Sequence, residues 1–418
     1  MSGPLSTDPL VPPGADPAPA PGWLVERLRR AGGAVPFATY MQWVLHDPDH
    51  GAYGAGRLRI GPRGDFATSP SLGPDFASLL AVQLIEWLEA LGPGPLVLIE
   101  AGPGEGSLAG QLAAELVRLR PDLAARTSLE LLEPNPAMAD RQRRQLAACP
   151  LPVRWRDPHA PGSPCPRAVL IAHEVLDALA VERLLWDGDQ WRLQQVALAA
   201  GPTPGLRLAP GDPLVGAPLE RLARVAAAAA DPGLLAGERP PGWCTELHPG
   251  VGPWLAQAAG LVEHGWLLVI DYALDAQRYY SPRRPDGTLM AYRDQRAHGD
   301  PLRDPGRTDL TAHLCVETLL QEAEASGWGA AAGHCLQGEA LLALGLAGRL
   351  HGLQAPGADS LAQRLARREA LLRLVDPAAL GAFRWFAWPR GAGAAAPRPR
   401  FLHEPQPEGD ESASARQD

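Results

Sequence analysis

The stretch "LVLIEAGPGEGSLAGQL", from Leu96 to Leu112, joins an apolar run to three alternating glycines and then to a helical pattern. An apolar run of this length is typical of a buried strand. Glycine permits positive φ and lets a ligand approach the backbone, and the first turn of a helix offers free N–H groups. The stretch therefore predicts a strand, a ligand-binding turn and a helix, as in a Rossmann-like α/β fold.

Two details of this turn indicate which cofactor it binds. Its glycines, Gly102, Gly104 and Gly106, follow the spacing GxGxG and lack the Lys-Ser/Thr pair of a triphosphate-binding loop. Glu100 ends the strand just before them, and a carboxylate there would repel a pyrophosphate. It suits the cationic amino-acid end of S-adenosyl-L-methionine. A nicotinamide-dependent oxidoreductase on the same fold stays the alternative.

A second acid, Glu133, ends the next predicted strand in "LELLEPNP". A carboxylate at this place can accept hydrogen bonds from both ribose hydroxyls of a nucleoside cofactor. The alternative is that Glu100 and Glu133 only terminate strands of a doubly wound sheet. We favour the cofactor site because both acids occur together with the glycine turn.

Strand and helix patterns alternate through the middle of the chain, which predicts a parallel sheet with crossover helices. The predicted strands are residues 96–100, 128–133, 152–155, 168–174, 190–198 and 265–273, and the predicted helices include 107–120, 137–148 and 253–262. A further amphipathic helix is expected within 74–92, before the first of these strands.

This pattern divides the chain into regions. The pattern predicts that residues 23–95 form a helical and loop region on the substrate side. It predicts that residues 96–345 form the S-adenosyl-L-methionine-binding domain, with an insertion of one helix at about 196–250. Residues 346–404 read as a helical extension. The two ends, 1–22 and 405–418, are rich in Pro or polar residues, and we expect them to be disordered.

Composition narrows the class of protein. The net charge of −9 argues against nucleic acid as a partner. The five cysteines contain no CxxC motif, which is typical of a reducing compartment, and the apolar run "GWLLVI" is too short to span a membrane. The N-terminus resembles neither a secretory signal nor a mitochondrial presequence, so we expect a cytoplasmic, bacterial protein.

We expect no metal site. His46 and His50 have the i, i+4 spacing of a metal-binding pair on a helix, but Pro48 lies between them and argues against a helix.

The segment "AVLIAHEVLDALAVERL" contains the candidate catalytic residues. His173, Glu174 and Asp177 follow a predicted strand, and ligands of open α/β sheets bind beyond the carboxyl ends of strands. Two carboxylates there could hold a guanidinium through charge-assisted hydrogen bonds. The alternative is that Asp177 caps a following helix and Glu174 is a solvated acid.

The segment "RGDFATSP", residues 63–70, lies before the sheet. Asp65 belongs to a turn, and Thr68 and Ser69 are possible hydroxyl donors to a ligand. Taken alone, these residues predict only a loop and the N-cap of the next helix. Three later segments, "DYA", "DGTLMAYRDQ" and "GRTDLTAH", are long polar stretches of the kind that is more often functional than not.

Together these segments resemble the MidA-like class I S-adenosylmethionine methyltransferases. The resemblance runs from about Phe37 to Leu346 and rests on nine blocks in the family's order: "FATYMQWVLHDPDHGAYG", "GDFATSPSLGPDFA", "IEAGPGEGSLAGQL", "LLEPNPAMADRQRRQL", "IAHEVLDALAVERL", "GWLLVIDYA", "DGTLMAYR", "DLTAH" and "LQGEALLALGL". Mitochondrial members of this family are protein-arginine methyltransferases that assist the assembly of respiratory complex I.

The resemblance implies an α/β methyltransferase fold with S-adenosyl-L-methionine as cofactor. It implies that Glu100, Gly102, Gly104 and Glu133 contact the cofactor, that "GDFATSP" closes over it, and that the region of Glu174 faces a protein substrate. In a respiratory context that substrate would be a complex I subunit.

The chain departs from the family pattern at three positions. His173 replaces an Asn, Ala180 a Pro and Ala273 a Gly. These departures leave a second alternative, a non-catalytic assembly factor that keeps the fold and binds a partner.

Overall fold

The computed structural model describes residues 18–61, 64–158, 162–199, 201, 204–355, 360–391 and 397–404. Most of the two expected disordered ends, residues 1–17 and 405–418, lies outside this range. The last residues of the expected N-terminal tail are structured, because β1 (Ala18–Pro19) pairs with β9 (Gly205–Pro213).

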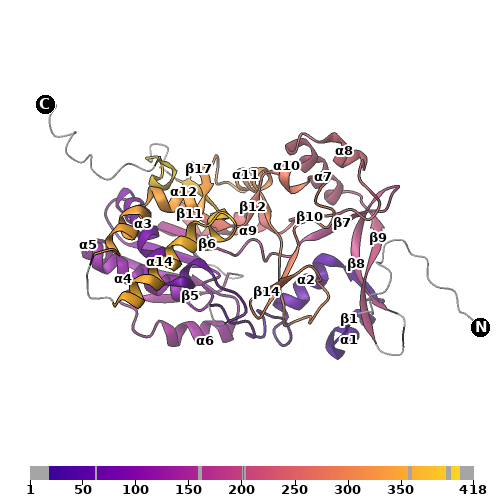
Figure 1. The fold of residues 1–418 in the computed structure, drawn as a ribbon, viewed down its shortest axis with the longest axis horizontal. Helices are drawn as coiled ribbons and strands as arrows, with labels where there is room; N and C mark the ends of the chain where they lie inside the picture. The colour runs from indigo at the N-terminus through magenta and orange to yellow at the C-terminus, as the bar shows by residue number, and fades with distance from the viewer. Residues whose placement is uncertain are drawn as a thin grey trace, which may run out of the picture.

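A seven-stranded sheet forms the larger lobe of the molecule (Figure 1). From one edge to the other its strands are β17 (Gly333–Leu336), β18 (Arg384–Arg390), β11 (Val262–Asp271), β6 (Cys165–His173), β3 (Leu96–Ala101), β4 (Thr127–Leu132) and β5 (Val153–Arg156). Neighbouring strands from β11 to β5 are parallel, and β18 is antiparallel to both its neighbours. The predicted Rossmann-like α/β fold is confirmed.

Helices cover both faces of this sheet, so its central strands are apolar on both sides. In β6, Val169 and Ile171 pack on one face, whereas Leu170 and Ala172 pack on the other. The first face is covered by α3 (Asp75–Ala90), α4 (Ser107–Leu119), α12 (Gln337–Ala343) and α14 (Leu361–Val375). The second face is covered by α9 (Val251–Leu261) and α11 (Val316–Ala325). The same lobe contains α5 (Pro121–Ala124), α6 (Pro136–Gln145) and α13 (Leu346–Gly352).

A second, antiparallel sheet forms the smaller lobe (Figure 1). Besides β1 and β9 it contains β2 (Ala34–Pro36), β7 (Glu182–Trp186), β8 (Trp191–Ala199) and β10 (Cys244–Leu247). One core joins it to α1 (Gly22–Arg30) and α2 (Phe37–His46). Another core joins it to α7 (Ala217–Ala228), α8 (Pro232–Ala236) and α10 (Ala276–Tyr279).

This second sheet changes two expectations. The predicted strand at 190–198 exists as β8, but it belongs to the antiparallel sheet. The reason is the tight turn before it, where the Asp187 carboxylate accepts the backbone N–H groups of Asp189 and Gln190, both at 2.8 Å. The expected insertion at 196–250 contains β9 and β10 as well as two helices, because these strands complete the same sheet.

The C-terminal region, expected to be helical over 346–404, also contributes a strand to the main sheet. Strand β18 pairs with β11 from Arg384 to Arg390, and its Trp385, Phe386 and Trp388 side chains are buried. Burial of these large rings on both faces outweighs a helical conformation here. The main sheet therefore extends beyond residue 345.

Two small sheets complete the fold. In one, β12 (Ala273–Leu274) is parallel to β16 (Leu314–Cys315). In the other, β13 (Met290–Arg293) pairs with both β14 (Arg296–His298) and β15 (Asp309–Thr311). The 3-10 turns in the described part of the chain are η1 (Ser69–Leu72), η2 (Leu380–Ala382) and η3 (Arg400–Leu402). Among the described residues, none of the helices is both long and apolar enough to cross a bilayer.

Gly265 in β11 provides a test of how closely β11 and β6 approach. It has a φ of +152°, and a Cβ added there would lie 1.7 Å from the carbonyl oxygen of Ala168. We expect Gly265→Ala to lower the free energy of unfolding by about 3 kcal/mol or more, measured by urea denaturation. Gly260→Ala is the control, because Gly260 lies in α9 with open space around it and should gain up to about 1 kcal/mol. Equal stability of the two variants would contradict this packing.

Candidate active site

The order of the strands places the candidate site between β3 and β6. From β3 the chain proceeds to β4 and β5 on one side, whereas β6 and β11 lie on the other. In open α/β sheets a ligand crevice forms at this switch point, beyond the carboxyl ends of the strands. Glu100 and Gly102 mark the end of β3, and His173 and Glu174 mark the end of β6. Two of the predicted site segments therefore leave neighbouring strands.

Glu100 is a buried carboxyl group with one oxygen available. The backbone amide of Ala109, in the first turn of α4, donates to the carboxylate. Its Oε2 atom is buried and has no hydrogen-bond partner among the described residues. Burial raises the pKa of Glu100 to about 8. A buried, unpaired carboxyl oxygen is costly alone and fits a cationic ligand group.

The glycine turn next to Glu100 needs glycine for both conformation and space. Gly102, Gly104 and Gly106 have φ values of +59°, +52° and +82°. A Cβ at Gly102 would lie 2.9 Å from Cγ2 of Val175, and one at Gly104 would lie 2.8 Å from Cδ1 of Ile60. The turn is therefore packed between the end of β6 and the loop that follows α2.

Glu133 is held at the end of β4 by two hydrogen bonds. Its Oε1 accepts the Asn135 amide at 2.9 Å, and its Oε2 accepts Nε2 of Gln142 at 2.8 Å. The same Gln142 amide donates to the carbonyl of Gly104 at 2.8 Å. A carboxylate oxygen can accept more than one hydrogen bond, so Glu133 keeps capacity for ligand hydroxyls.

The loop after α2 is fastened across this crevice to α6. The Asn135 side chain donates to the carbonyl oxygens of Tyr53 and Gly54, the latter at 2.6 Å. Arg141 donates to the carbonyl of Leu58 at 3.1 Å. These contacts hold Ile60 over the glycine turn.

A cavity of about 220 Å³ lies on the β6 side of the crevice, and we call it the acidic cavity. It is lined by Tyr53, Asp65, Phe66, Ala67, Glu174, Asp177, Tyr272, Tyr292, Gln295, Ala297, Asp309, Thr311 and Arg373. The sequence identified three of its acids as individual candidates, namely Asp65, Glu174 and Asp177. It did not single out the three tyrosines or Asp309, although "DYA", "DGTLMAYRDQ" and "GRTDLTAH" contain Tyr272, Tyr292 and Asp309.

The electrostatics of the acidic cavity favour a cation. Burial, then the neighbouring carboxylates Asp271 and Asp309, raise the pKa of Glu174 well above its usual value. Burial, then Asp271 and Glu174, have the same effect on the pKa of Asp177. Burial raises the pKa of Asp309 to about 7, and its Oδ1 has no hydrogen-bond partner among the described residues. A cation placed among these acids would relieve their mutual repulsion.

Asp271 fixes the turn that carries Glu174 and Asp177. Its Oδ2 accepts the backbone amides of Val175, Leu176 and Asp177 at 3.3, 3.0 and 3.3 Å. Glu174 has a φ of +54°, a left-handed conformation that is uncommon outside glycine and concentrates at functional sites.

The alternative interpretation of these acids does not match the structure. The chain forms a turn rather than a helix after Asp177 and continues into β7. Asp177 is only 3% exposed and Glu174 is partly buried, so neither is a solvated edge acid.

His173, expected to be catalytic, lies behind Glu174 and does not line the acidic cavity. Its ring packs against Phe76 and Phe383, with centroids at 5.4 and 6.2 Å. Its Nδ1 atom is 3.5 Å from Oε1 of Glu174, and burial lowers its pKa to about 3. The buried imidazole is therefore neutral and packs between these rings beside Glu174.

Asp65, expected among the cofactor ligands, lines the acidic cavity. Its Oδ2 accepts the backbone amide of Arg59 at 2.9 Å, and its carbonyl accepts the amide of Gln295 at 2.7 Å. It joins the loop after α2 to the β13–β14 turn, which forms a wall of this cavity.

Thr68 and Ser69, also expected among the cofactor ligands, lie at the start of η1. The Thr68 carbonyl accepts the hydroxyl of Ser71 at 2.7 Å, which starts η1. The Ser69 hydroxyl is within 3.2 Å of Nε2 of Gln337, and the Ser69 backbone amide donates to Glu174. The structure therefore brings Ser69 to the candidate catalytic acid.

A group of possible metal ligands, Asp47, Asp49 and His50, lies near the end of α2. Asp47 pairs with Arg27 at 2.6 Å and accepts the backbone amides of Asp49 and His50. These contacts account for the burial of Asp47.

Residues 79–332 match the profile of a family described as "Putative S-adenosyl-L-methionine-dependent methyltransferase". The chain is also similar to the mitochondrial protein arginine methyltransferase NDUFAF7 homolog of Drosophila melanogaster. The two are 28% identical over 86% of this chain and 83% of that protein. The rat protein arginine methyltransferase NDUFAF7 is 26% identical over 86% of this chain and 81% of its own length.

Among solved structures, the fold is similar to a Burkholderia thailandensis protein described as a likely methyl transferase and bound to S-adenosyl-homocysteine. The TM-score is 0.79 at 27% identity, covering 93% of this chain and 99% of that one. A second Burkholderia thailandensis structure of the same superfamily gives a TM-score of 0.74 at 26% identity, with the same coverage.

Glu100 provides a direct test of the cofactor site. We expect Glu100→Gln to weaken binding of S-adenosyl-L-methionine about 100-fold in isothermal titration calorimetry, because a charge-assisted contact to its ammonium is lost. Glu89→Gln is the control, since Glu89 lies on α3 in an ion pair with Arg120, and its affinity should stay within twofold. Unchanged affinity in Glu100→Gln would remove Glu100 from the cofactor site.

Proposed function

The chain belongs to this family of S-adenosyl-L-methionine-dependent methyltransferases, and from that premise we propose that it methylates an arginine side chain of a protein. The observation that carries this proposal is the acidic cavity, where buried carboxyl groups and tyrosine rings surround a space beside the cofactor crevice. A guanidinium satisfies such a site through both charge and planar hydrogen bonding.

The residues around the glycine turn fit S-adenosyl-L-methionine. We assign Oε2 of Glu100 to its ammonium, the carboxylate of Glu133 to its ribose hydroxyls and the glycine turn to close backbone approach. The chemistry that this cofactor supplies when bound is a methyl group made electrophilic by a positive sulfur. Because these groups belong to rigid strand ends, the chain contributes mainly orientation and proximity.

In the acidic cavity, Glu174 and Asp177 accept hydrogen bonds from the guanidinium and direct one of its nitrogens toward the crevice. Tyr53, Tyr272 and Tyr292 line the same cavity, and aromatic rings near a guanidinium attract it. When the nitrogen gains a methyl group it must lose a proton, and a carboxylate oxygen of Glu174 accepts it. The raised pKa of Glu174 makes it a stronger base than a solvated carboxylate.

The relatives' names support a protein as the methyl acceptor, since they are called protein arginine methyltransferases. Following the family resemblance, we propose a respiratory complex I subunit as the first substrate to test. The five cysteines are all unpaired, which supports a reducing compartment such as the bacterial cytoplasm. We assign cofactor binding to residues 96–345 together with β18, and the substrate side to 23–95.

Arginine methylation can be tested with the candidate catalytic acids. We expect Glu174→Gln and Asp177→Asn each to lower kcat for methyl transfer to an arginine peptide by about 100-fold or more, because orientation and proton acceptance are lost. Transfer is measured with S-adenosyl-L-methionine labelled in its methyl group, and the modified residue is identified by mass spectrometry.

The control for these variants is cofactor affinity, which should change less than threefold. Asp189→Asn, in the exposed β7–β8 turn, should keep full activity. Methylation of another residue type would overturn the arginine assignment. A wild-type protein that binds the cofactor but transfers no methyl group to cellular proteins would favour the non-catalytic assembly factor.

The pKa of Asp309 predicts that KM for an arginine peptide depends on pH. Its pKa of about 7 lies above the usual value for Asp, so below that pH the group is protonated and cannot attract a cation. We expect KM for an arginine peptide to fall as pH rises from 6 to 8. In Asp309→Asn this change should disappear and KM at pH 8 should be about tenfold higher. An unchanged pH profile in Asp309→Asn would contradict its role.

A further inference from the structure

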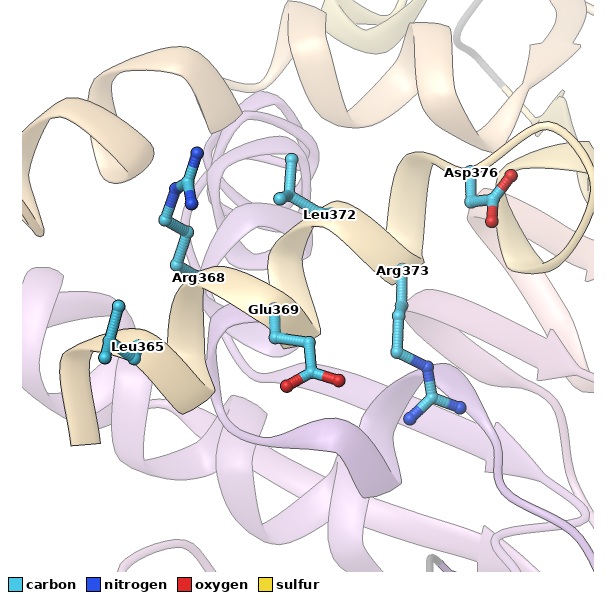
Figure 2. A pocket seen from close by; sticks show the side chains of 6 residues that line it. All are labelled: Leu365, Arg368, Glu369, Leu372, Arg373 and Asp376. Atoms are coloured by element: carbon cyan, nitrogen blue, oxygen red, sulfur yellow. The ribbon is translucent and has the colours of Figure 1, made fainter. Parts of the chain in front are cut away.

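One face of α14 presents a surface that the methyl-transfer site does not explain. A hollow of about 490 Å³ lies on this helix, and Figure 2 shows the side chains around it. The lining residues are Leu365, Arg368, Glu369, Leu372, Arg373 and Asp376. We call this surface the α14 face.

The α14 face carries a stripe of exposed leucines. Leu361, Leu365 and Leu372 are 64%, 55% and 44% exposed. At 100° per residue their side chains fall within a sector of about 40°, so they lie in one row along the helix. Single exposed leucines are ordinary, but a row of them on one helix is typical of an interaction surface.

Charged side chains flank this row without partners of their own. In Figure 2, Arg368 points to one side of the helix, whereas Glu369 and Arg373 point to the other. Within the described ranges no ion pair involves Arg368, Glu369 or Arg373. Apolar groups bordered by unpaired charges of both signs fit a polypeptide better than a small apolar ligand.

The opposite side of α14 is firmly attached. Arg367 donates to both carboxylate oxygens of Asp75 at the start of α3, at 3.0 and 2.7 Å. Gln337 donates to the carbonyl of Leu374 at 3.1 Å, and Leu371 is fully buried. The helix is therefore a fixed platform, which reduces the entropy lost when a partner binds.

Arg373 connects this platform to the candidate active site. It lines the α14 face and also the acidic cavity. Arg373 is thus common to both surfaces, so a chain whose side chain enters the acidic cavity beside Arg373 can continue along α14.

We propose that the α14 face is the docking surface for the protein substrate, and that it binds the substrate residues that precede or follow the methylated one. This proposal rests on the function proposed above. An acidic residue next to the target pairs with Arg373, which would otherwise repel a cationic target. Apolar residues farther along contact Leu372, Leu365 and Leu361. From Arg373 to Leu361 the helix rises about 18 Å, which an extended chain spans in about six residues.

The experiment compares three synthetic peptides as substrates of the full-length protein in the presence of S-adenosyl-L-methionine. The short peptide is acetyl-Gly-Arg-Gly-amide. The docking peptide has fifteen residues, a central arginine flanked by aspartates, and leucines up to six residues away on both sides. The third peptide replaces those leucines and aspartates with serines. We expect kcat/KM for the docking peptide to exceed that of the serine peptide at least tenfold.

The first variant is Leu365→Ser with Leu372→Ser, which should reduce kcat/KM for the docking peptide about tenfold and leave the short peptide within twofold. Because Arg373 also lines the acidic cavity, Arg373→Glu is judged by a ratio: kcat/KM for the docking peptide relative to the short peptide should fall about tenfold. The matched control is Leu219→Ser with Leu235→Ser, two leucines of the smaller lobe that are 39% and 41% exposed, and it should change neither peptide.

Binding without transfer separates this proposal from the proposed function. A fluorescent docking peptide with glutamine in place of its arginine is titrated by anisotropy, and the leucine variant should bind it about tenfold more weakly. If no arginine peptide is methylated but this difference persists, arginine methylation fails and docking stands. If all proteins bind and methylate the peptides equally, docking is overturned.

A second copy of this chain is the competing occupant of the α14 face. A wild-type dimer in analytical ultracentrifugation that the leucine variant converts to a monomer, with unchanged peptide kinetics, would assign the surface to that copy and overturn the proposal.

Discussion

The hydrogen bonds to Asp271 are the constraint on which the candidate site depends. Three amides of the turn after β6 converge on one oxygen of this buried carboxylate, and the Tyr272 amide donates to the other at 2.8 Å. A buried carboxylate is costly unless it accepts such bonds, and a left-handed residue such as Glu174 costs about 1–3 kcal/mol. The hydrogen bonds to Asp271 offset both costs, because the turn that donates them is the turn that holds Glu174 in its left-handed conformation. The acids of the cavity are thus held in place by a rigid turn at the strand ends.

Gln337 connects the C-terminal helices to the turn that carries Glu174. It is fully buried, its Oε1 accepts the indole N–H of Trp385 at 3.2 Å, and its amide donates to the carbonyl of Leu380 at 2.9 Å. The same amide lies beside the Ser69 hydroxyl, while the Ser69 backbone reaches Glu174. Buried polar networks of this kind fix a single arrangement when every member is satisfied. The C-terminal region is therefore part of the site's support and holds α14 beside the acidic cavity.

Much of the central fold could be predicted from local patterns. The apolar run, glycine turn and amphipathic helix of 96–112 became β3 and α4 with nearly the expected boundaries, since buried strands and helix starts have strong local signals. The second sheet could not be predicted in the same way. Strand β8 has the same local pattern in a parallel or an antiparallel sheet, and only the tight turn before it selected the antiparallel partner. For β18, the choice between helix and strand was made by a partner more than 100 residues earlier in the chain.

The sequence by itself determined the kind of cofactor turn and which acids follow β3, β4 and β6, because these depend on residue type and neighbours along the chain. The tertiary structure decided what each acid does. It left an oxygen of Glu100 unpaired and His173 outside the lining of the acidic cavity. It also brought Tyr53, Tyr292, Asp309 and Glu174 together around one space. Those residues lie far apart in the sequence, and their proximity follows from how the two lobes pack. Burial and nearby charge, which set the pKa of a carboxyl group, exist only after that packing has formed.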